Sequence, residues 1–159
     1  MIQDMVYEVA LEFRNGIVNA NLNGEFKGDR FIESFPKGNC GIASNLLGRY
    51  LLERYGIRSW YTSGEIKNDS HVWLTLEDHY IVDITGDQYK NRLGVMFYDK
   101  PIYVGKMDMF HKRFKLNSKP VEITPNDWTP DWLGEDDLQL KNRKAYETIL
   151  KYVSLVKKE

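Results

Sequence analysis

FPKGNCGIASNLLGRYLLERYG, residues 35–56, is the stretch that decides the fold. Apolar side chains recur in it at intervals of three and four residues, which predicts a helix with one face turned to a core. Gly56 follows the last of them and predicts the helix end, because glycine readily adopts the left-handed conformation found there. A loop containing Pro36 and Gly38 precedes the helix. Cys40, the only cysteine in the chain, therefore lies in the first helical turn. The apolar residues are Ile42, Leu46, Leu47, Tyr50, Leu51 and Tyr55.

The position of Cys40 suits a nucleophile. The thiolate is the reactive form of cysteine, and backbone N–H groups at a helix start stabilise negative charge. Asn39 is expected to be the N-cap residue, or a donor to an oxyanion if its side chain does not cap. Gly41 would leave room for a substrate carbonyl. A small buried thiol is also a common structural occupant of a helix start, so the partners of Cys40 decide between these interpretations.

A predicted hairpin supplies those partners. Two strand-like runs, HVWLTL and YIVDIT, are joined by the loop EDH. A three-residue loop pairs Trp73 with Asp83 and His71 with Thr85, so His71, Trp73 and Asp83 project from one face. Trp73 is also a candidate to contact the substrate. Asp83 can then orient the His71 imidazole and stabilise its charged form, as a catalytic triad requires. A loop of two or four residues would place His71 and Asp83 on opposite faces.

The order of cysteine at a helix start, then histidine, then aspartate on adjacent strands resembles the transglutaminase-like branch of the papain-like superfamily. FPKGNCGIASNLLGRYLLERYG, SHVWLTLEDHYIVDITGDQY and YVGKMDMFHKRF are similar to the blocks of a group of small uncharacterised bacterial proteins, in the same order. The blocks cover roughly half of the chain. The resemblance implies an α+β fold and a triad of Cys40, His71 and Asp83. It implies no substrate, because the superfamily includes proteases, amidases, cross-linking enzymes, acyltransferases and inactive members.

The chain departs from the papain pattern before the cysteine. Papain-type proteases have a glutamine there as an oxyanion donor, whereas this chain has Ser34, Phe35 and Pro36. Asn39 or backbone N–H groups would have to serve instead.

Further polar residues are candidates for the site. Gln88 could hydrogen-bond across it or close a loop, and the loop role is favoured. Asp87 is a reserve third triad member, although a turn role after Gly86 is more expected. His111, in FHKRF, is expected to be structural.

The rest of the chain predicts one α+β domain over residues 1–159, with a cysteine-bearing helix packed on an antiparallel sheet and flanking terminal helices. Residues 2–13 have the spacing of a helix that Asn15 and Gly16 end, and the Asn- and Gly-rich segment after it predicts an irregular loop or short strands. Trp128 and Trp132 could wall a substrate groove or pack the last helix onto the sheet. The other expected elements are strands at 58–66, 71–76, 80–85, 101–105 and 114–123, a loop at 126–134 and a helix at 135–158.

Composition excludes several classes of function. With 22 basic and 23 acidic residues the chain has no charge excess for binding nucleic acid. No apolar run approaches the length of a membrane span, and the first residues lack the pattern of a signal peptide, so a cytoplasmic protein is expected. One cysteine and three scattered histidines do not have zinc-ligand spacing, so no metal or other cofactor is expected.

Two functions remain. The first is an enzyme that attacks an amide or ester carbonyl of a peptide, protein or small molecule through Cys40, with an acyl-enzyme intermediate. The second is a non-catalytic binding module that keeps the fold, for example a component of a bacterial toxin or phage-related system. Catalysis predicts Cys40 beside His71 in an open cleft, whereas a binding module could bury Cys40 or separate the two residues. The sequence leaves the oligomeric state open.

Overall fold

The computed structural model describes residues 2–29, 32–128 and 136–157, which form an α+β fold. Its helices are α1 (Ile2–Leu22), α2 (Cys40–Tyr55) and α3 (Asp136–Lys157). Short 3-10 turns η1 (Gly86–Tyr89), η2 (Gly94–Met96) and η3 (His111–Arg113) interrupt the loops. The described helices include none that is both long and apolar enough to cross a membrane.

The strands form one antiparallel sheet in the order β4-β3-β2-β1-β5, and β6 also pairs with β1. Its long central hairpin joins β1 and β2, and shorter strands extend it on both sides. The strands are β1 (Ser59–Ile66), β2 (Asp69–Leu76), β3 (Ile81–Asp83), β4 (Tyr103–Gly105), β5 (Lys115–Leu116) and β6 (Val121–Glu122). The run expected as one strand at 114–123 is therefore two short strands, which pair with different parts of β1.

The register of β2 and β3 is the one that the sequence predicted. Leu74 lies opposite Val82 and Thr75 opposite Ile81. The three-residue loop closes without glycine because His79 adopts a φ of +68°, a conformation that non-glycine residues adopt only occasionally. This register places His71 and Asp83 on the same face of the sheet.

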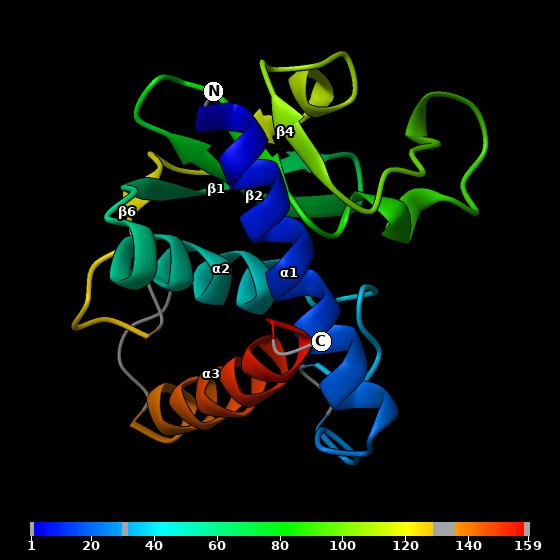
Figure 1. The fold of residues 1–159 in the computed structure, drawn as a ribbon. Helices are drawn as coiled ribbons and strands as arrows, with labels where there is room; N and C mark the ends of the chain where they lie inside the picture. The colour runs from blue at the N-terminus through cyan, green and yellow to red at the C-terminus, as the bar shows by residue number, and fades with distance from the viewer. Residues whose placement is uncertain (1, 30–31, 129–135, 158–159) are drawn as a thin grey trace.

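The sheet has a different kind of core on each face. On one face Val72, Leu74 and Leu76 join the main apolar cluster, against which α2 packs. Figure 1 shows α2 and α3 on the same side of the sheet, with α1 running past both. The opposite face carries a smaller cluster, mostly aromatic, made of Trp73, Ile81, Tyr89, Tyr98, Phe110 and Phe114. The candidate site lies in this aromatic layer.

The prediction that Asn15 and Gly16 end the first helix is wrong. Helix α1 continues to Leu22, and only residues 23–28 form the turns expected for the whole segment. Gly16 is buried against α3, where an added Cβ would lie 2.7 Å from Val153 Cγ2 and 3.3 Å from Ile149 Cγ2. The glycine therefore allows two helices to approach closely and does not stop the first one.

Trp128 has a packing role. The Arg49 guanidinium stacks over its ring at 3.4 Å, and Tyr146 of α3 contacts the ring edge. Trp132, the second tryptophan proposed for a groove wall, lies outside the described residues, as do residues 129–134 of the expected loop and residue 135 of the expected helix.

Candidate active site

Helix α2 presents Cys40 as its first residue, at the edge of the core. The helix body is anchored by buried side chains such as Leu46 and Leu51, and Gly56 ends it with a φ of +64° and an N–H bond to the Leu52 carbonyl. Cys40 itself is half-buried, which leaves part of the residue accessible. The Asn39 side chain is buried and makes no cap hydrogen bond, so the side-chain capping predicted for it is wrong.

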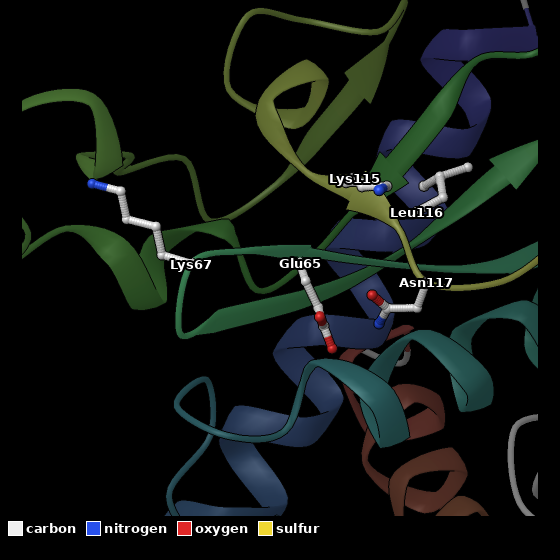
Figure 2. A pocket seen from close by; sticks show the side chains of 5 residues that line it. All are labelled: Glu65, Lys67, Lys115, Leu116 and Asn117. Carbon is white, nitrogen blue, oxygen red and sulfur yellow. The ribbon is translucent and has the colours of Figure 1, made fainter.

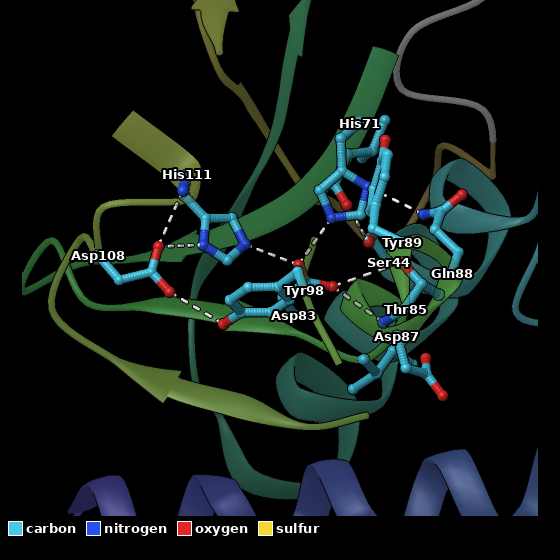
Figure 3. Close-up of polar contacts among 12 residues, drawn as sticks. Ser44, His71, Asp83, Thr85, Asp87, Gln88, Tyr89, Tyr98, Asp108 and His111 are labelled. Atoms are coloured by element: carbon cyan, nitrogen blue, oxygen red, sulfur yellow. Dashed lines mark hydrogen bonds and ion pairs between the residues drawn. The ribbon is translucent and has the colours of Figure 1, made fainter. Parts of the chain in front are cut away.

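Asp83 is the buried anion of the site. Its Oδ2 accepts a hydrogen bond from His71 Nε2 at 2.7 Å (Figure 3), and its Oδ1 accepts from the Thr85 backbone N–H at 2.9 Å. Burial acts to raise the pKa of Asp83, but His71 and His111 hold that pKa well below its usual range. The carboxylate is therefore ionised throughout the neutral range.

His71 connects Asp83 to Cys40. The ring is fully buried; it is hydrogen-bonded to Asp83 and also interacts with the Cys40 side chain. Burial acts to lower the pKa of His71, but Asp83 and then Cys40 outweigh it and raise the pKa to about 10. The structure thus brings together the three residues that the sequence singled out, with an imidazole that favours its protonated form.

The 3-10 turn η1 closes one side of the His71 ring. Gln88 Nε2 lies 3.1 Å from His71 Nδ1, so the Gln88 amide contacts the ring across the site, the alternative that the sequence did not favour. A protonated His71 would donate from Nδ1 to the oxygen of this amide, with the amide group turned over. The Tyr89 hydroxyl donates to the Ser70 carbonyl at 2.9 Å and holds the turn against β2. Asp87 instead forms a two-bond ion pair with Arg14 of α1, which excludes it as the third triad member in this arrangement.

His111 is the site residue that the sequence did not identify. Its Nε2 lies 2.7 Å from Asp83 Oδ2, the same oxygen that His71 contacts, and its Nδ1 lies 2.5 Å from Asp108 Oδ1. The Tyr98 hydroxyl donates to the other oxygen of Asp108 at 2.9 Å. The histidine in FHKRF was the signal available, but no periodic pattern connects residue 111 to a hairpin so far away in the chain.

Two residues expected to contact substrate have other neighbours. Trp73 is fully buried, with its ring centroid 5.8 Å from that of His71 and 5.0 Å from that of His111, so it supports both imidazoles from within the aromatic layer. At Gly41 an added Cβ would lie 2.8 Å from the Tyr61 hydroxyl oxygen. That hydroxyl occupies part of the space that was expected to admit a substrate carbonyl.

His71, Asp83 and His111 are of residue types that bind metal ions in other proteins, and their side chains converge here. One ligand atom of each lies within 4.8 Å of the others, a convergence that spacing along the sequence did not reveal. However, both Nε2 atoms already share Asp83 Oδ2 at hydrogen-bond distance. An ion would have to displace both of these protons, so the contacts fit a proton network better than a metal site.

A surface hollow lies on the β1 and β5 side of the sheet. Figure 2 shows that its lining side chains belong to β1, to the turn after it and to the segment around β5; they are Glu65, Lys67, Lys115, Leu116 and Asn117. The lining has acidic and basic side chains and does not include Cys40, His71 or Asp83, so we assign the hollow no part in the candidate active site.

Neither a protein-family model, nor a curated protein, nor a solved structure matches the chain. The function is therefore inferred from the chemistry of the site itself.

Proposed function

We propose that the protein is a cysteine-dependent hydrolase or acyltransferase that attacks an amide or ester carbonyl through Cys40. The observation that carries this proposal is the 2.7 Å hydrogen bond between His71 and Asp83, together with Cys40 as a further interaction partner of the same imidazole. The thiol of a half-buried cysteine, a buried imidazole and a buried carboxylate in this order would supply a nucleophile, an acid–base group and a group that orients it. We also propose the papain-like, transglutaminase-like relation, because this series is what that resemblance implies.

The proton balance follows from the raised pKa of His71. In the proposed reaction His71 takes the proton of Cys40, so sulfur attacks as a thiolate beside an imidazolium. Sulfur attacks the carbonyl carbon and the carbonyl oxygen takes the negative charge. When the tetrahedral species collapses, the bond to the leaving group breaks and His71 gives that group its proton. Water or an amine then attacks the thioester, His71 takes its proton, and the cysteine is released.

The start of α2 supplies the groups that would stabilise the oxyanion. Backbone N–H groups of the first helical turn, with that of Cys40 among them, have no partners within the helix and favour negative charge. Asn39 lies directly before them with its side chain not used as a cap. The Tyr61 hydroxyl lies close to Gly41 on the same side. These groups would replace the glutamine that papain-type proteases use.

The non-catalytic alternative is less favoured. A binding module has no need of a thiol hydrogen-bonded to an imidazole that is itself fixed by a buried carboxylate. A free thiol that must remain reduced also suits the cytoplasm, which we propose as the location. The acyl donor would be a peptide, a protein or a small amide or ester, with water or an amine as acceptor.

Acyl-enzyme formation tests the proposal. Incubation with p-nitrophenyl acetate should add one acetyl group to Cys40, detected by intact-mass and peptide mass spectrometry. His71→Ala should slow this addition by at least about 100-fold, the usual contribution of an acid–base group. Hydroxylamine should release the acetyl group as expected for a thioester. An adduct that forms at the same rate without His71, or no adduct on the folded protein, would refute the proposal.

A further inference from the structure

His111 lies between two carboxylates in the centre of the aromatic layer. Its ring is 0% exposed and faces Asp83 with one nitrogen and Asp108 with the other, at 2.7 and 2.5 Å. Because an ionised carboxylate only accepts hydrogen bonds, both nitrogens of His111 donate. The ring is therefore an imidazolium, a buried cation with an anion on each side.

The surroundings of His111 support this charge state. Burial acts to lower the pKa of His111, but its bonds to Asp108 and Asp83 raise it. The other titratable groups that face it are His71, Tyr98 and Tyr103, and burial raises the pKa of both tyrosines, which keeps them neutral. Lys100 lies over the rings of Tyr98 and Tyr103, further out.

The same contacts fix the position of the ring. The His111 backbone N–H donates to Asp108 Oδ1 at 2.8 Å, and the Tyr98 hydroxyl donates to Asp108 Oδ2, so Asp108 is held from both sides. Tyr103 stacks on the imidazole and the edge of Trp73 contacts it. The turn η3 therefore offers Asp83 a donor that has little freedom to move.

Asp83 uses this donor to complete its hydrogen bonds. Oδ1 accepts from the Thr85 N–H and hydroxyl, and Oδ2 accepts from His71 and His111. Without His111, Oδ2 would have one donor, and the carboxylate could rotate away from the line between Thr85 and His71. Asp83 and Asp108 would also lose the cation that separates them.

We propose that His111 is a positioning residue for the reaction at Cys40: clamped by Asp108, it fixes the Asp83 carboxylate that orients His71. This proposal rests on the function proposed above, and it extends the relay from a triad to five residues, Cys40, His71, Asp83, His111 and Asp108. His111 touches no reacting atom and acts through Asp83.

The test compares His111→Gln with Lys112→Gln. Both variants remove one basic side chain from η3, but Lys112 is exposed and serves as the matched control. His111→Gln can still donate to Asp83 but carries no charge and cannot also bind Asp108 in the same geometry. We expect it to lower the acetylation rate constant of Cys40 at least about tenfold, with the p-nitrophenyl acetate concentration for half-maximal rate unchanged, whereas Lys112→Gln stays within about twofold.

Asp108→Asn is the second variant, for the case that His111→Gln does not fold. It keeps His111 and its bond to Asp83, because the amide oxygen can accept from Nδ1. Without the second anion, His111 should lose a proton nearer neutral pH, and the pH profile of acetylation should gain an inflection between about pH 6 and 8. The inflection should be absent from wild type and from Lys112→Gln. A purely structural role would lower stability and leave the shape of the profile unchanged.

Proton NMR of the unreacted protein separates the two proposals. The low-field imidazole N–H signals of His71 and His111 should both be present at neutral pH, and the His71 signal should shift or broaden in His111→Gln. If wild type forms no acyl adduct but the His71 signal moves, the proposed reaction fails and the positioning stands. If the His71 signal, the acetylation rate and the pH profile are all unchanged in folded His111→Gln and Asp108→Asn, the positioning role is refuted.

Discussion

Replacing Asp83 with asparagine tests the residue on which the proposed chemistry depends. The carboxylate accepts four hydrogen bonds, from His71, His111 and two groups of Thr85. An asparagine side chain has only one oxygen, so its N–H₂ group would face either the two histidine donors or the two Thr85 donors. Breaking a buried charge pair in this way costs about 3–5 kcal/mol of the free energy of unfolding.

The effect on His71 follows from its pKa. With a pKa of about 10, the imidazole is protonated in nearly every molecule at pH 7.5. Without the Asp83 charge, the largest influence that raises the pKa of His71 is gone, and burial still acts to lower that pKa. If the pKa of His71 fell to the ordinary value of about 6.5, about one imidazole in eleven would be protonated at pH 7.5. The population of imidazolium available to stabilise the thiolate therefore falls about tenfold or more.

Asp87→Asn is the matched control, because both aspartates lie in the same short segment and both are paired. Asp87 bonds to Arg14 and not to His71, so its replacement should cost about 1–3 kcal/mol of unfolding free energy. The alkylation rate of Cys40 by iodoacetamide at pH 7.5 should drop about tenfold or more in Asp83→Asn and stay near wild type in Asp87→Asn. Near-UV circular dichroism confirms folding. Equal rates in the two folded variants would refute the assignment of Asp83.

Three further predictions concern stability, each measured by urea unfolding. Gly16→Ala should destabilise the protein by about 1–3 kcal/mol because the added Cβ would meet Val153. Asn15→Ala, at an exposed position of the same helix, should not destabilise it. A gain of about 1 kcal/mol in the stability of Gly16→Ala, as expected from helix propensity alone, would contradict the close contact between α1 and α3. The pKa of Asp108 is lowered in the fold despite its burial, by its bonds to His111. A lowered carboxylate pKa adds stability that is present above the ordinary value and lost as pH falls. Stability should therefore decline below about pH 4, less steeply in Asp108→Asn, and equal slopes would contradict this. Arg49→Met should cost about 3 kcal/mol or more because the buried guanidinium donates to several backbone carbonyls, and a neutral result would contradict that role.

Local patterns predicted the elements that carry Cys40, His71 and Asp83, the proposed triad. The period of α2 and its glycine end placed Cys40 at a helix start, and a loop of three residues fixed the register of β2 and β3. The loop length fixes the register of the hairpin, and because strand side chains alternate, the register determines which residues share a face. The shared face of His71 and Asp83 could therefore be predicted without knowledge of the rest of the fold.

Contacts between distant segments could not be predicted in the same way. The residue types at Asn15 and Gly16 predict a helix end, and only the position of α3 explains why a glycine lies inside α1. His111 is brought to Asp83 by a loop whose course no periodicity determines. Trp73 was assigned to the correct face, but the aromatic layer that covers it is assembled from residues far along the chain.

The most direct test of the central claim is the rate of Cys40 alkylation by iodoacetamide as a function of pH, in wild type and in His71→Ala. The account predicts that wild type reacts readily well below pH 7 and that His71→Ala loses this low-pH reactivity, because the thiolate depends on the imidazolium beside it. A wild-type rate that rises near pH 8.5, as for an ordinary thiol, and is unchanged by His71→Ala would contradict the claim that Cys40 and His71 form a catalytic pair.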